Sequence, residues 1–427
     1  MAETRPDKPQ GDKLQGGKLQ HDTFRPDTRE QLAELVTWAA SEEAPLEVAG
    51  AGSKRGLGRP MQTRATVDLT GFRGIELYEP EELILKAGAG TPIQELVAEL
   101  ERNHQAFAFE PPDLAPLLGG SAGQGTLGGA VACNLAGPRR VKAGAARDHF
   151  LGYNGVNGRG ENYKSGGRVV KNVTGYDLCK LMAGSYGTLT LMTDITMKVL
   201  PASEATRTVL LTGLDVPVAV RALTAGLCSS YEVSGAAHLP AEVAQTSAVG
   251  EVAQAGGPVT ALRLEGPPKS VEHRANKIAQ VVTEFGRAEE LGHDDSLALW
   301  AEIRDVKPFV GLDATAVWRV SVPPASGPRV AERLRGLDER ASLFLDWGGG
   351  LLWLALPEGE DARHAEVRAA LGDTGGHATL IKANDGVRAK VPVFQPQEAG
   401  LEALSKNIKD GFDPKRLLNP GRMYAGV

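Results

Sequence analysis

The stretch from residue 119 to residue 201 restricts the fold of this chain most, because glycine recurs through it between short apolar segments. Glycine lets the backbone reach positive φ and lie directly against a ligand, with no Cβ between them. Such a stretch suits either a turn-rich β domain or a surface of bare backbone for a flat, phosphate-bearing cofactor. Three clusters, at 50–58, 125–134 and 171–178, distinguish these alternatives.

The first cluster reads Gly50-Ala-Gly-Ser-Lys-Arg-Gly-Leu-Gly58 and follows an apolar, strand-like segment. A Rossmann fingerprint is improbable, because the third glycine comes one residue late and a proline soon follows. The cluster also lacks the Gly-Lys-Ser/Thr ending of a P-loop. We interpret it as a nest of backbone N–H groups for an anion, with Ser53, Lys54 and Arg55 adding donors. The alternative is an exposed basic turn.

The second cluster, residues 125–134, places paired glycines before small residues, as backbone packed face-on against a ring system would require. Thr126 and Asn134 could donate hydrogen bonds to that ring. The alternative is close helix packing through the small residues. In the third cluster, residues 171–178, Asp177 is either part of a binding motif or the N-cap of a helix at 178–183.

Composition excludes several classes of function. The net charge of −6 argues against a nucleic-acid or anionic-lipid partner, and no apolar run approaches the roughly 20 residues of a membrane span. The three cysteines lie far apart, which excludes iron–sulfur or zinc motifs of Cys-x-x-Cys spacing, and the eight histidines are scattered. We expect no protein-held metal and a reducing, cytoplasmic location.

Two capping signals predict helices in the first hundred residues. Thr28 and Gln31 have the spacing of a capping box before an apolar helical face. Thr91 is predicted to be the N-cap of a second helix, with Pro92 at its first position.

Taken in order, these clusters resemble the FAD-binding domain of the vanillyl-alcohol-oxidase type, also called the p-cresol methylhydroxylase type. Further motifs of the resemblance are Arg147-Asp148, Gly184-Ser-Tyr-Gly-Thr-Leu189 and the terminal segment 413–421. Within that type, the chain is similar to the FAD-binding E subunits of bacterial glycolate oxidases, through the segments 109–112, 134–140, 142–148 and 167–178.

The resemblance implies that FAD is the cofactor, with its pyrophosphate at 50–58, its flavin and ribityl chain along 126–134 and its adenine end in 172–199. Covalent members carry a histidine near the first loop, where this chain has Ser-Lys-Arg, so noncovalent binding is expected. The residues expected to bind FAD are Gly50, Ala51, Gly52, Ser53, Lys54, Arg55, Gly56, Leu57, Gly125, Thr126, Leu127, Gly128, Gly129, Ala132, Cys133, Asn134, Gly137, Asp148, Gly175, Asp177, Leu178, Gly187, Ile195 and Asn419.

The expected fold class is α+β, with a two-subdomain FAD-binding domain and an antiparallel α+β cap. Alternation of strands and helices after residue 201 predicts the cap. The expected divisions are a disordered tail at 1–23, the FAD-binding domain at 24–204, the cap at 205–382 and a return segment packing on the FAD domain at 383–427.

The chain departs from its hydroxy-acid-oxidising relatives at two points. Their metal-binding motif His-x-Gly-Asp-Gly-Asn-x-His is missing, since His364 and His377 are isolated. Their Gly-Ser-Glu-Gly turn reads Gly-Ser-Tyr-Gly187, which removes a carboxylate. The resemblance therefore implies FAD binding, and it leaves open whether this chain abstracts the substrate α-hydrogen.

The leading hypothesis is a FAD-binding subunit of a complex that oxidises glycolate, or another D-2-hydroxy acid, to glyoxylate or its analogue. Electrons would pass through flavin to an iron–sulfur F-type partner, beside a catalytic flavoprotein D-type partner. Any membrane association would be peripheral and made through these partners. One alternative is a stand-alone oxidoreductase of a hydroxy acid or sugar, with Arg139, Arg140 or Arg388 holding a carboxylate. Another is a flavin-binding assembly subunit without catalysis.

Overall fold

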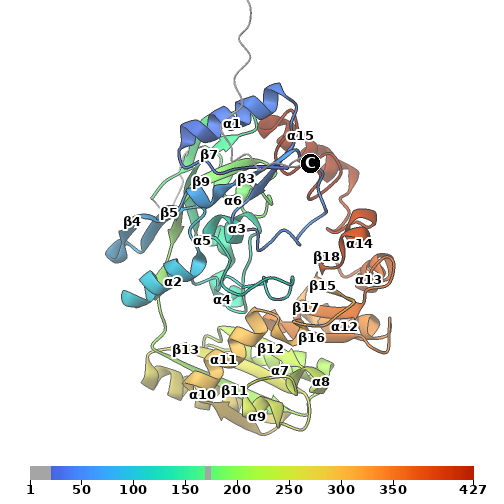
Figure 1. Ribbon diagram of the computed structural model, residues 1–427. Coiled ribbons are helices and arrows are strands. Elements are labelled where there is room, and N and C mark those ends of the chain that lie inside the picture. The colour runs from blue at the N-terminus through green and yellow to red at the C-terminus, as the bar shows by residue number, and fades with distance from the viewer. Residues whose placement is uncertain (1–20, 169–174) are drawn as a thin grey trace, which may run out of the picture.

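The computed structural model describes residues 21–168 and 175–427. Most of the predicted tail, and Lys171 to Thr174 of the third cluster, lie outside the described residues. In Figure 1 the first half of the chain lies above the second half, and the C-terminal segment returns to the first. None of the helices in the described ranges is long and apolar enough to cross a bilayer.

A three-stranded parallel sheet begins the first half, with β1 (Asp22–Phe24), β3 (Ala65–Asp68) and β2 (Leu46–Ala49) in that order. Strand β1 takes in the last two residues of the predicted tail. Helix α1 (Arg29–Ser41) packs on this sheet, and Thr28 caps it by accepting a hydrogen bond from Gln31 N. The side chain of Gln31 accepts from Asp27 N, one residue earlier than a capping box predicts.

A five-stranded antiparallel sheet completes the first half, with the order β4-β5-β9-β7-β8. The central strand β9 is buried at every residue before Lys198, although threonines and Asp194 alternate with its apolar residues. The strands are β4 (Ile75–Glu79), β5 (Ile84–Gly88), β7 (Phe150–Asn157), β8 (Asn162–Gly166) and β9 (Thr190–Lys198), and the short pair is β6 (Gln105–Ala106) with β10 (Leu200–Pro201). The helices are α2 (Ile93–Arg102), α3 (Leu127–Ala132), α4 (Arg140–Ala143), α5 (Ala146–His149) and α6 (Leu178–Met182).

Two predicted caps differ in the structure. The N-cap of α2 is Pro92 and not Thr91, because the Thr91 hydroxyl accepts from Gly74 N at 2.9 Å and donates to Gly88 O at 2.7 Å. Asp177 does occupy the N-cap position of α6, yet its side chain makes no capping hydrogen bond. At neither helix does the predicted side chain accept a hydrogen bond from the backbone amides of the first turn.

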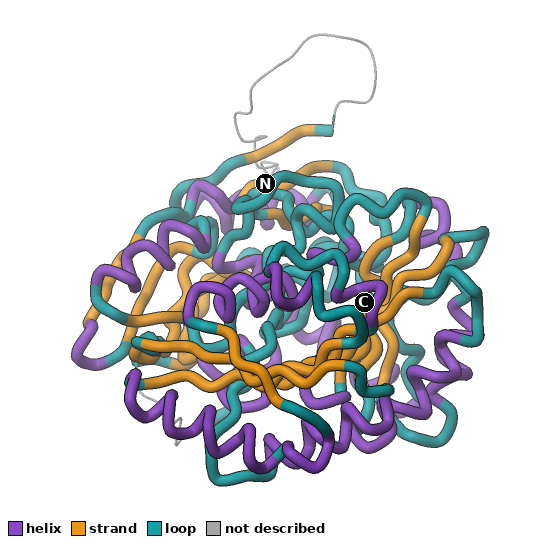
Figure 2. Tube along the Cα trace, turned by 90° about the horizontal axis from the view of Figure 1, so that it is seen from below, coloured by secondary structure: helices purple, strands orange, loops and turns teal. Residues whose placement is uncertain are grey.

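The second half is built on one eight-stranded sheet with the order β14-β11-β13-β12-β16-β17-β15-β18, antiparallel at every described pairing, as predicted for the cap. Figure 2 shows its strands with helices along them. The strands are β11 (Ala205–Thr212), β12 (Gly235–Leu239), β13 (Val259–Gly266), β14 (Ala288–Leu291), β15 (Thr315–Ser321), β16 (Ser342–Asp346), β17 (Leu351–Pro357) and β18 (His377–Lys382). The helices are α7 (Val216–Leu227), α8 (Ala241–Ala244), α9 (Gly250–Ala253), α10 (Pro268–Val281), α11 (His293–Arg304), α12 (Gly327–Arg335) and α13 (His364–Leu371).

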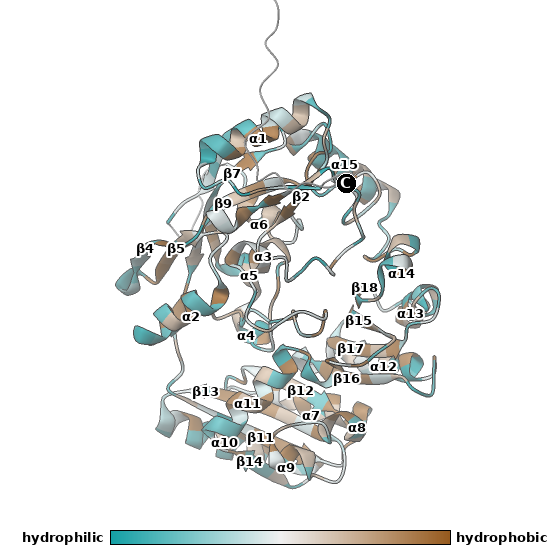
Figure 3. Ribbon diagram, viewed as in Figure 1, coloured by the Kyte–Doolittle hydropathy of each residue, from teal (hydrophilic) through white to brown (hydrophobic). Residues whose placement is uncertain are grey.

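Both faces of this sheet are buried. Figure 3 shows that its strands are largely apolar. On β11, Val209 and Leu211 pack with α7 and α10, whereas Leu210 on the opposite face belongs to a cluster with α11. That second cluster also contains Leu57 and Leu114 of the first half. Because successive strand residues point to opposite faces, the apolar run in β11 joins the two halves of the molecule.

After α14 (Asp385–Lys390) and α15 (Ala399–Phe412), the last residues pack against the first sheet. Leu46 N donates to Leu417 O at 2.7 Å, and Leu46 forms a parallel bridge with Leu418. The C-terminal segment therefore holds the strand that leads into the glycine-rich loop at 50–58.

Candidate functional site

The loop at 50–58 presents free backbone donors at the end of β2. The amides of Arg55 and Leu57 bond to carbonyls within the loop, whereas those of Gly52, Ser53 and Lys54 have no hydrogen-bond partner among the described residues. Gly52 has a φ of +77°, which L-residues rarely adopt. Three successive free amides are the backbone donors that the predicted anion nest requires, and anion binding by this loop stays a prediction.

Two arginines fix this loop by its carbonyl groups. Arg388 Nη1 donates to Gly56 O and Gly58 O at 2.8 and 2.6 Å, and its Nη2 bonds to Asp385. Arg422, from the C-terminal segment, donates to Lys54 O at 2.9 Å and to Leu57 O at 3.3 Å. The hydrogen bonds of Arg388 fit a structural role, and its predicted contact with a substrate carboxylate stays a prediction.

The second cluster forms α3 and packs closely against the first. Thr126 caps α3 through its hydroxyl, which accepts from Gly129 N at 3.3 Å. A Cβ on Gly50 would lie 2.6 Å from that hydroxyl oxygen, and a Cβ on Gly128 would lie 2.9 Å from Ala89 O. The close-packing interpretation of this cluster is confirmed, whereas its contact with a ring system stays a prediction, supported by the position of these glycines beside a cavity.

The turn at 184–187 completes the arrangement, and the C-terminal segment holds it in place. Asn419 accepts from Val48 N at 2.8 Å through Oδ1 and donates to Tyr186 O at 2.8 Å through Nδ2. Gly187 has a φ of +72°, and a Cβ there would lie 2.8 Å from Asn419 Nδ2. Asn419 therefore joins β2 to this turn.

A cavity of about 80 Å³ lies where the loop at 50–58, helix α3 and the turn meet. Twelve residues predicted to bind FAD line it, namely Gly50, Ala51, Gly52, Ser53, Lys54, Arg55, Thr126, Gly128, Gly129, Ala132, Cys133 and Gly187. Nine lining residues were missed, namely Glu47, Val48, Ala49, Leu69, Ala89, Tyr186, Thr190, Met192 and Arg422. Arg422 could have been predicted, because it is a basic residue directly after the Asn-Pro-Gly421 motif.

The other predicted residues lie outside this lining. Leu57 is in the core, Gly125 borders a second cavity, and Ile195 is buried in the five-stranded sheet. The remaining ones are Gly56, Leu127, Asn134, Gly137, Asp148 and Asn419, which lie within or beside the same loops, and Gly175, Asp177 and Leu178, which lie next to the undescribed segment. Their part in cofactor binding stays a prediction.

The cavity is positively charged. The Lys54 ammonium lies 3.5 Å from Ser53 Oγ and makes no ion pair with any described residue, and burial lowers its pKa. Arg422 adds a second charge, while the one lining carboxylate, Glu47, is paired with Arg55. Burial raises the pKa of the Cys133 thiol and keeps it neutral. Free amides, two cations and apolar side chains fit a dinucleotide diphosphate with an attached ring.

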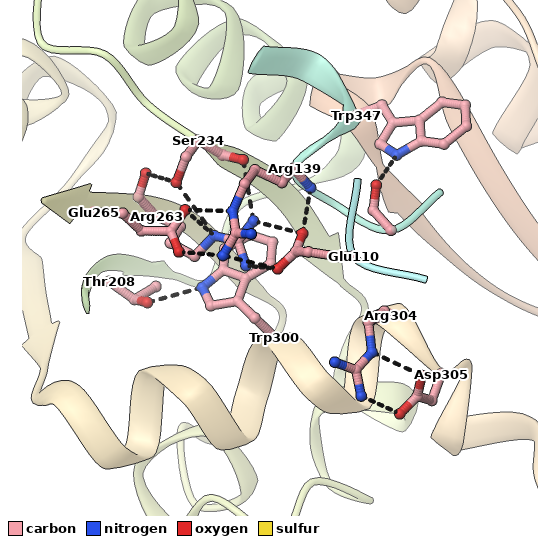
Figure 4. Close-up of polar contacts among 11 residues, drawn as sticks. Glu110, Arg139, Thr208, Ser234, Arg263, Glu265, Trp300, Arg304, Asp305 and Trp347 are labelled. Carbon is pink, nitrogen blue, oxygen red and sulfur yellow. Dashed lines mark hydrogen bonds and ion pairs between the residues drawn. The ribbon is translucent and has the colours of Figure 1, made fainter. Parts of the chain in front are cut away.

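A buried ionic network joins the two halves beside a second cavity of about 800 Å³ (Figure 4). Glu110 and Arg139 come from the first half, and Arg263 and Glu265 from β13. Arg263 donates to both oxygens of Glu110 at 2.8 and 3.0 Å, and Arg139 donates to both oxygens of Glu265 at 3.0 and 2.7 Å. Burial alone would raise the pKa of Glu265, yet the two guanidinium groups bring it to about 2. Arg139, a predicted substrate contact, is thus paired within this network.

Asp346 provides a pH-dependent test of the packing between the halves. Its carboxyl is buried, accepts from Trp347 N at 2.7 Å, and has a pKa raised by burial to about 7. The folded chain therefore holds one more proton than the unfolded chain between about pH 4 and pH 7, and stability falls as pH rises through that interval. We expect Asp346→Asn to gain on the order of 4 kcal/mol relative to wild type between those values.

Urea unfolding of the wild type and of Asp346→Asn across about pH 4–8 measures the difference in their free energies of unfolding. His238, whose pKa burial lowers to about 4, titrates with the opposite sign in both chains and cancels from the comparison. A stability difference between wild type and Asp346→Asn that does not change with pH would contradict the raised pKa of Asp346.

Comparison with known proteins agrees with this geometry. Residues 23–166 match the family described as FAD binding domain. In solved structures the fold recurs in alkyldihydroxyacetonephosphate synthase, with a TM-score of 0.70 and 15% identity over 94% of this chain and 76% of that one. It recurs in p-cresol methylhydroxylase with substrate bound, with a TM-score of 0.66 and 15% identity over 95% and 88%. The chain therefore contains a FAD binding domain and has the fold of p-cresol methylhydroxylase, and the predicted α+β fold and FAD cofactor are confirmed.

Sequence similarity narrows the class to a family. The Escherichia coli K12 protein "Glycolate oxidase subunit GlcE" is 34% identical over 400 residues, which cover 93% of this chain and 98% of that protein. This chain belongs to the family of that glycolate oxidase subunit.

Proposed function

We propose that the chain is the FAD-binding subunit of a complex that oxidises glycolate, or a similar D-2-hydroxy acid, to the corresponding 2-oxo acid. The observation that carries the proposal is the convergence of three sequence-distant segments on one positively charged cavity. Similarity to a glycolate oxidase subunit over nearly its whole length supports the substrate class. FAD is held noncovalently in this proposal, because the cavity lining contains no histidine among the described residues.

The proposal assigns the metal-dependent steps to partners. Among the described residues no three His, Cys, Asp or Glu side chains are grouped as metal ligands would be. Cys133, Cys179 and Cys228 lie in different environments, half-buried, buried and exposed. An F-type partner would therefore hold the iron–sulfur clusters that accept single electrons from flavin, and a D-type flavoprotein would be the second partner. The complex would work in the cytoplasm, with any membrane attachment made by its partners.

The test is purification of the native complex through a tag on this chain. We expect the complex to contain FAD on this chain and to reduce a dye when glycolate is added. Anaerobic glycolate should bleach the flavin absorbance of the complex. Bleaching of the isolated chain would identify a stand-alone oxidoreductase instead, and a chain without FAD, even after incubation with excess cofactor, would contradict the proposal.

A further inference from the structure

Two arginines from opposite halves of the molecule lie against one indole ring. Arg140 begins α4 in the first half, and Arg319 lies on β15 in the second. Their guanidinium carbons are 4.8 and 5.0 Å from the ring centroid of Trp347, the first residue of the short helix η6 (Trp347–Gly349). The indole is itself fixed, because its Nε1 donates to Gly137 O at 3.2 Å (Figure 4). Such ring contacts hold each guanidinium in place while leaving its edge free to bond.

Neither guanidinium has a hydrogen-bond or ion-pair partner in the described part of the chain. Within the described residues, Arg140 and Arg319 make no hydrogen bond through their side chains and no ion pair. This contrasts with the adjacent Arg139, whose side chain is bidentate to Glu265. Burial, with a smaller contribution from the charge of Arg140, lowers the pKa of Arg319 to about 10. Burial also lowers the pKa of Arg140.

Two like charges without an ion-pair partner cost free energy, because buried charges are ordinarily paired. Asp148 acts on Arg140 and Asp346 acts on Arg319, but neither carboxylate forms an ion pair with its arginine. An anion between them would remove that cost. Both side chains keep nitrogen atoms that solvent can reach, since none of these atoms is among the fully enclosed, unpartnered ones of the described residues. Water can therefore reach both guanidinium groups.

The position of the pair relates it to the cofactor cavity. Tyr186 lines that cavity, and its hydroxyl has no hydrogen-bond partner among the described residues. Burial raises the pKa of Tyr186, and the charge of Arg319 acts against that rise, so the two side chains are near each other. Tyr186 and Trp347, the ring that the two arginines contact, also pack against the same hydrophobic cluster.

We propose that Arg140 and Arg319 bind the carboxylate of the small 2-hydroxy acid and determine the specificity of this chain for carboxylic acids. The inference rests on the proposed function and deepens it. A planar carboxylate matches the bidentate edge of a guanidinium, which a neutral sugar or alcohol cannot use. The cofactor's own phosphates are a less suitable anion, because the free amides, Lys54 and Arg422 already provide for them.

The test uses the full chain loaded with FAD and titrated with oxalate, a redox-inert carboxylate the size of glycolate. Calorimetry and the flavin difference spectrum should both report binding to the wild type. We expect Arg319→Gln and Arg140→Gln each to raise the dissociation constant at least about tenfold, with FAD content unchanged. The oxalate dissociation constant of Arg319→Lys should lie between those of the wild type and Arg319→Gln, since lysine keeps the charge and lacks the planar edge of a guanidinium. Arg329→Gln, which removes an exposed charge from the same half, is the matched control.

Oxalate binding by both glutamine variants as tight as by the wild type would overturn the proposal, as would a wild type that binds no oxalate. Loss of FAD from the variants would also overturn it, by assigning the pair to the cofactor's phosphates. If Arg319→Gln does not fold, Arg319→Lys carries the same comparison. A wild-type complex with FAD that oxidises glycolate, combined with variants that still bind oxalate, would refute this inference and leave the proposed function standing.

Discussion

A chain carrying Lys54→Glu should purify without bound FAD and should bind added FAD at least about 100-fold more weakly than the wild type, a loss of roughly 3 kcal/mol. Lys54 is half-buried in the cavity lining, and no described carboxylate pairs with it. Its ammonium stands beside the free amides of the loop, where the cofactor's diphosphate is expected. The reversal replaces an attraction with a repulsion in a partly desolvated place, where charge interactions are screened less than at the surface.

The control for this prediction is Arg64→Glu, which changes the net charge equally at an exposed position outside the cavity. Apoprotein of each variant is titrated with FAD while flavin fluorescence is recorded, and far-UV circular dichroism confirms folding. Affinity of Lys54→Glu within threefold of the control would contradict the assignment of the diphosphate to the loop at 50–58.

The sequence was sufficient to predict the anion nest, because its signal is local. Gly52 needs a positive φ, and Ser53 and Lys54 supply donors at fixed positions in the same turn. Sequence could not predict that Arg388 would reach the carbonyls of Gly56 and Gly58 from more than 300 residues away. That contact depends on how α14 packs, which no short motif encodes.

The Arg319–Trp347 contact was missed for a related reason. Both residues lie in the second half, in strand and turn sequences that carry no pattern beyond alternating apolar residues. Their partner Arg140 was a candidate by its charge alone. Thr91 illustrates the opposite error, because a good capping sequence was present and its hydroxyl was used by two backbone groups of other segments. The hydrogen-bond partner of a side chain can be predicted from sequence when that partner is the backbone of the same turn. It cannot be predicted when tertiary packing brings in a partner from another segment.

Lys409→Met should destabilise the folded chain by about 3–5 kcal/mol, the cost of leaving a buried charge without its partner. Lys409 is fully buried, and its Nζ donates to Asp413 Oδ2 at 2.8 Å, to Thr188 O at 2.6 Å and to Leu418 O at 2.8 Å. Asp413 in turn accepts from the amide of Leu418. The substitution would leave a buried carboxylate without its cation and would remove the Lys409 hydrogen bonds to two carbonyls, where the C-terminal segment meets the first half.

The same helix provides a matched control. Lys406 pairs with Glu402 at the same four-residue spacing on the exposed side of α15, and Lys406→Met should change stability by no more than about 0.5 kcal/mol. Urea unfolding of the two variants, followed by circular dichroism, compares a buried pair with an exposed pair on the same helix. Because Asn419 and Arg422 follow Lys409 in the chain and hold the cofactor cavity, FAD should also dissociate from Lys409→Met at lower urea than from Lys406→Met. Equal unfolding midpoints and equal FAD release would show that the return segment is held by its apolar contacts alone, and that the buried ion pair contributes nothing to the cofactor site.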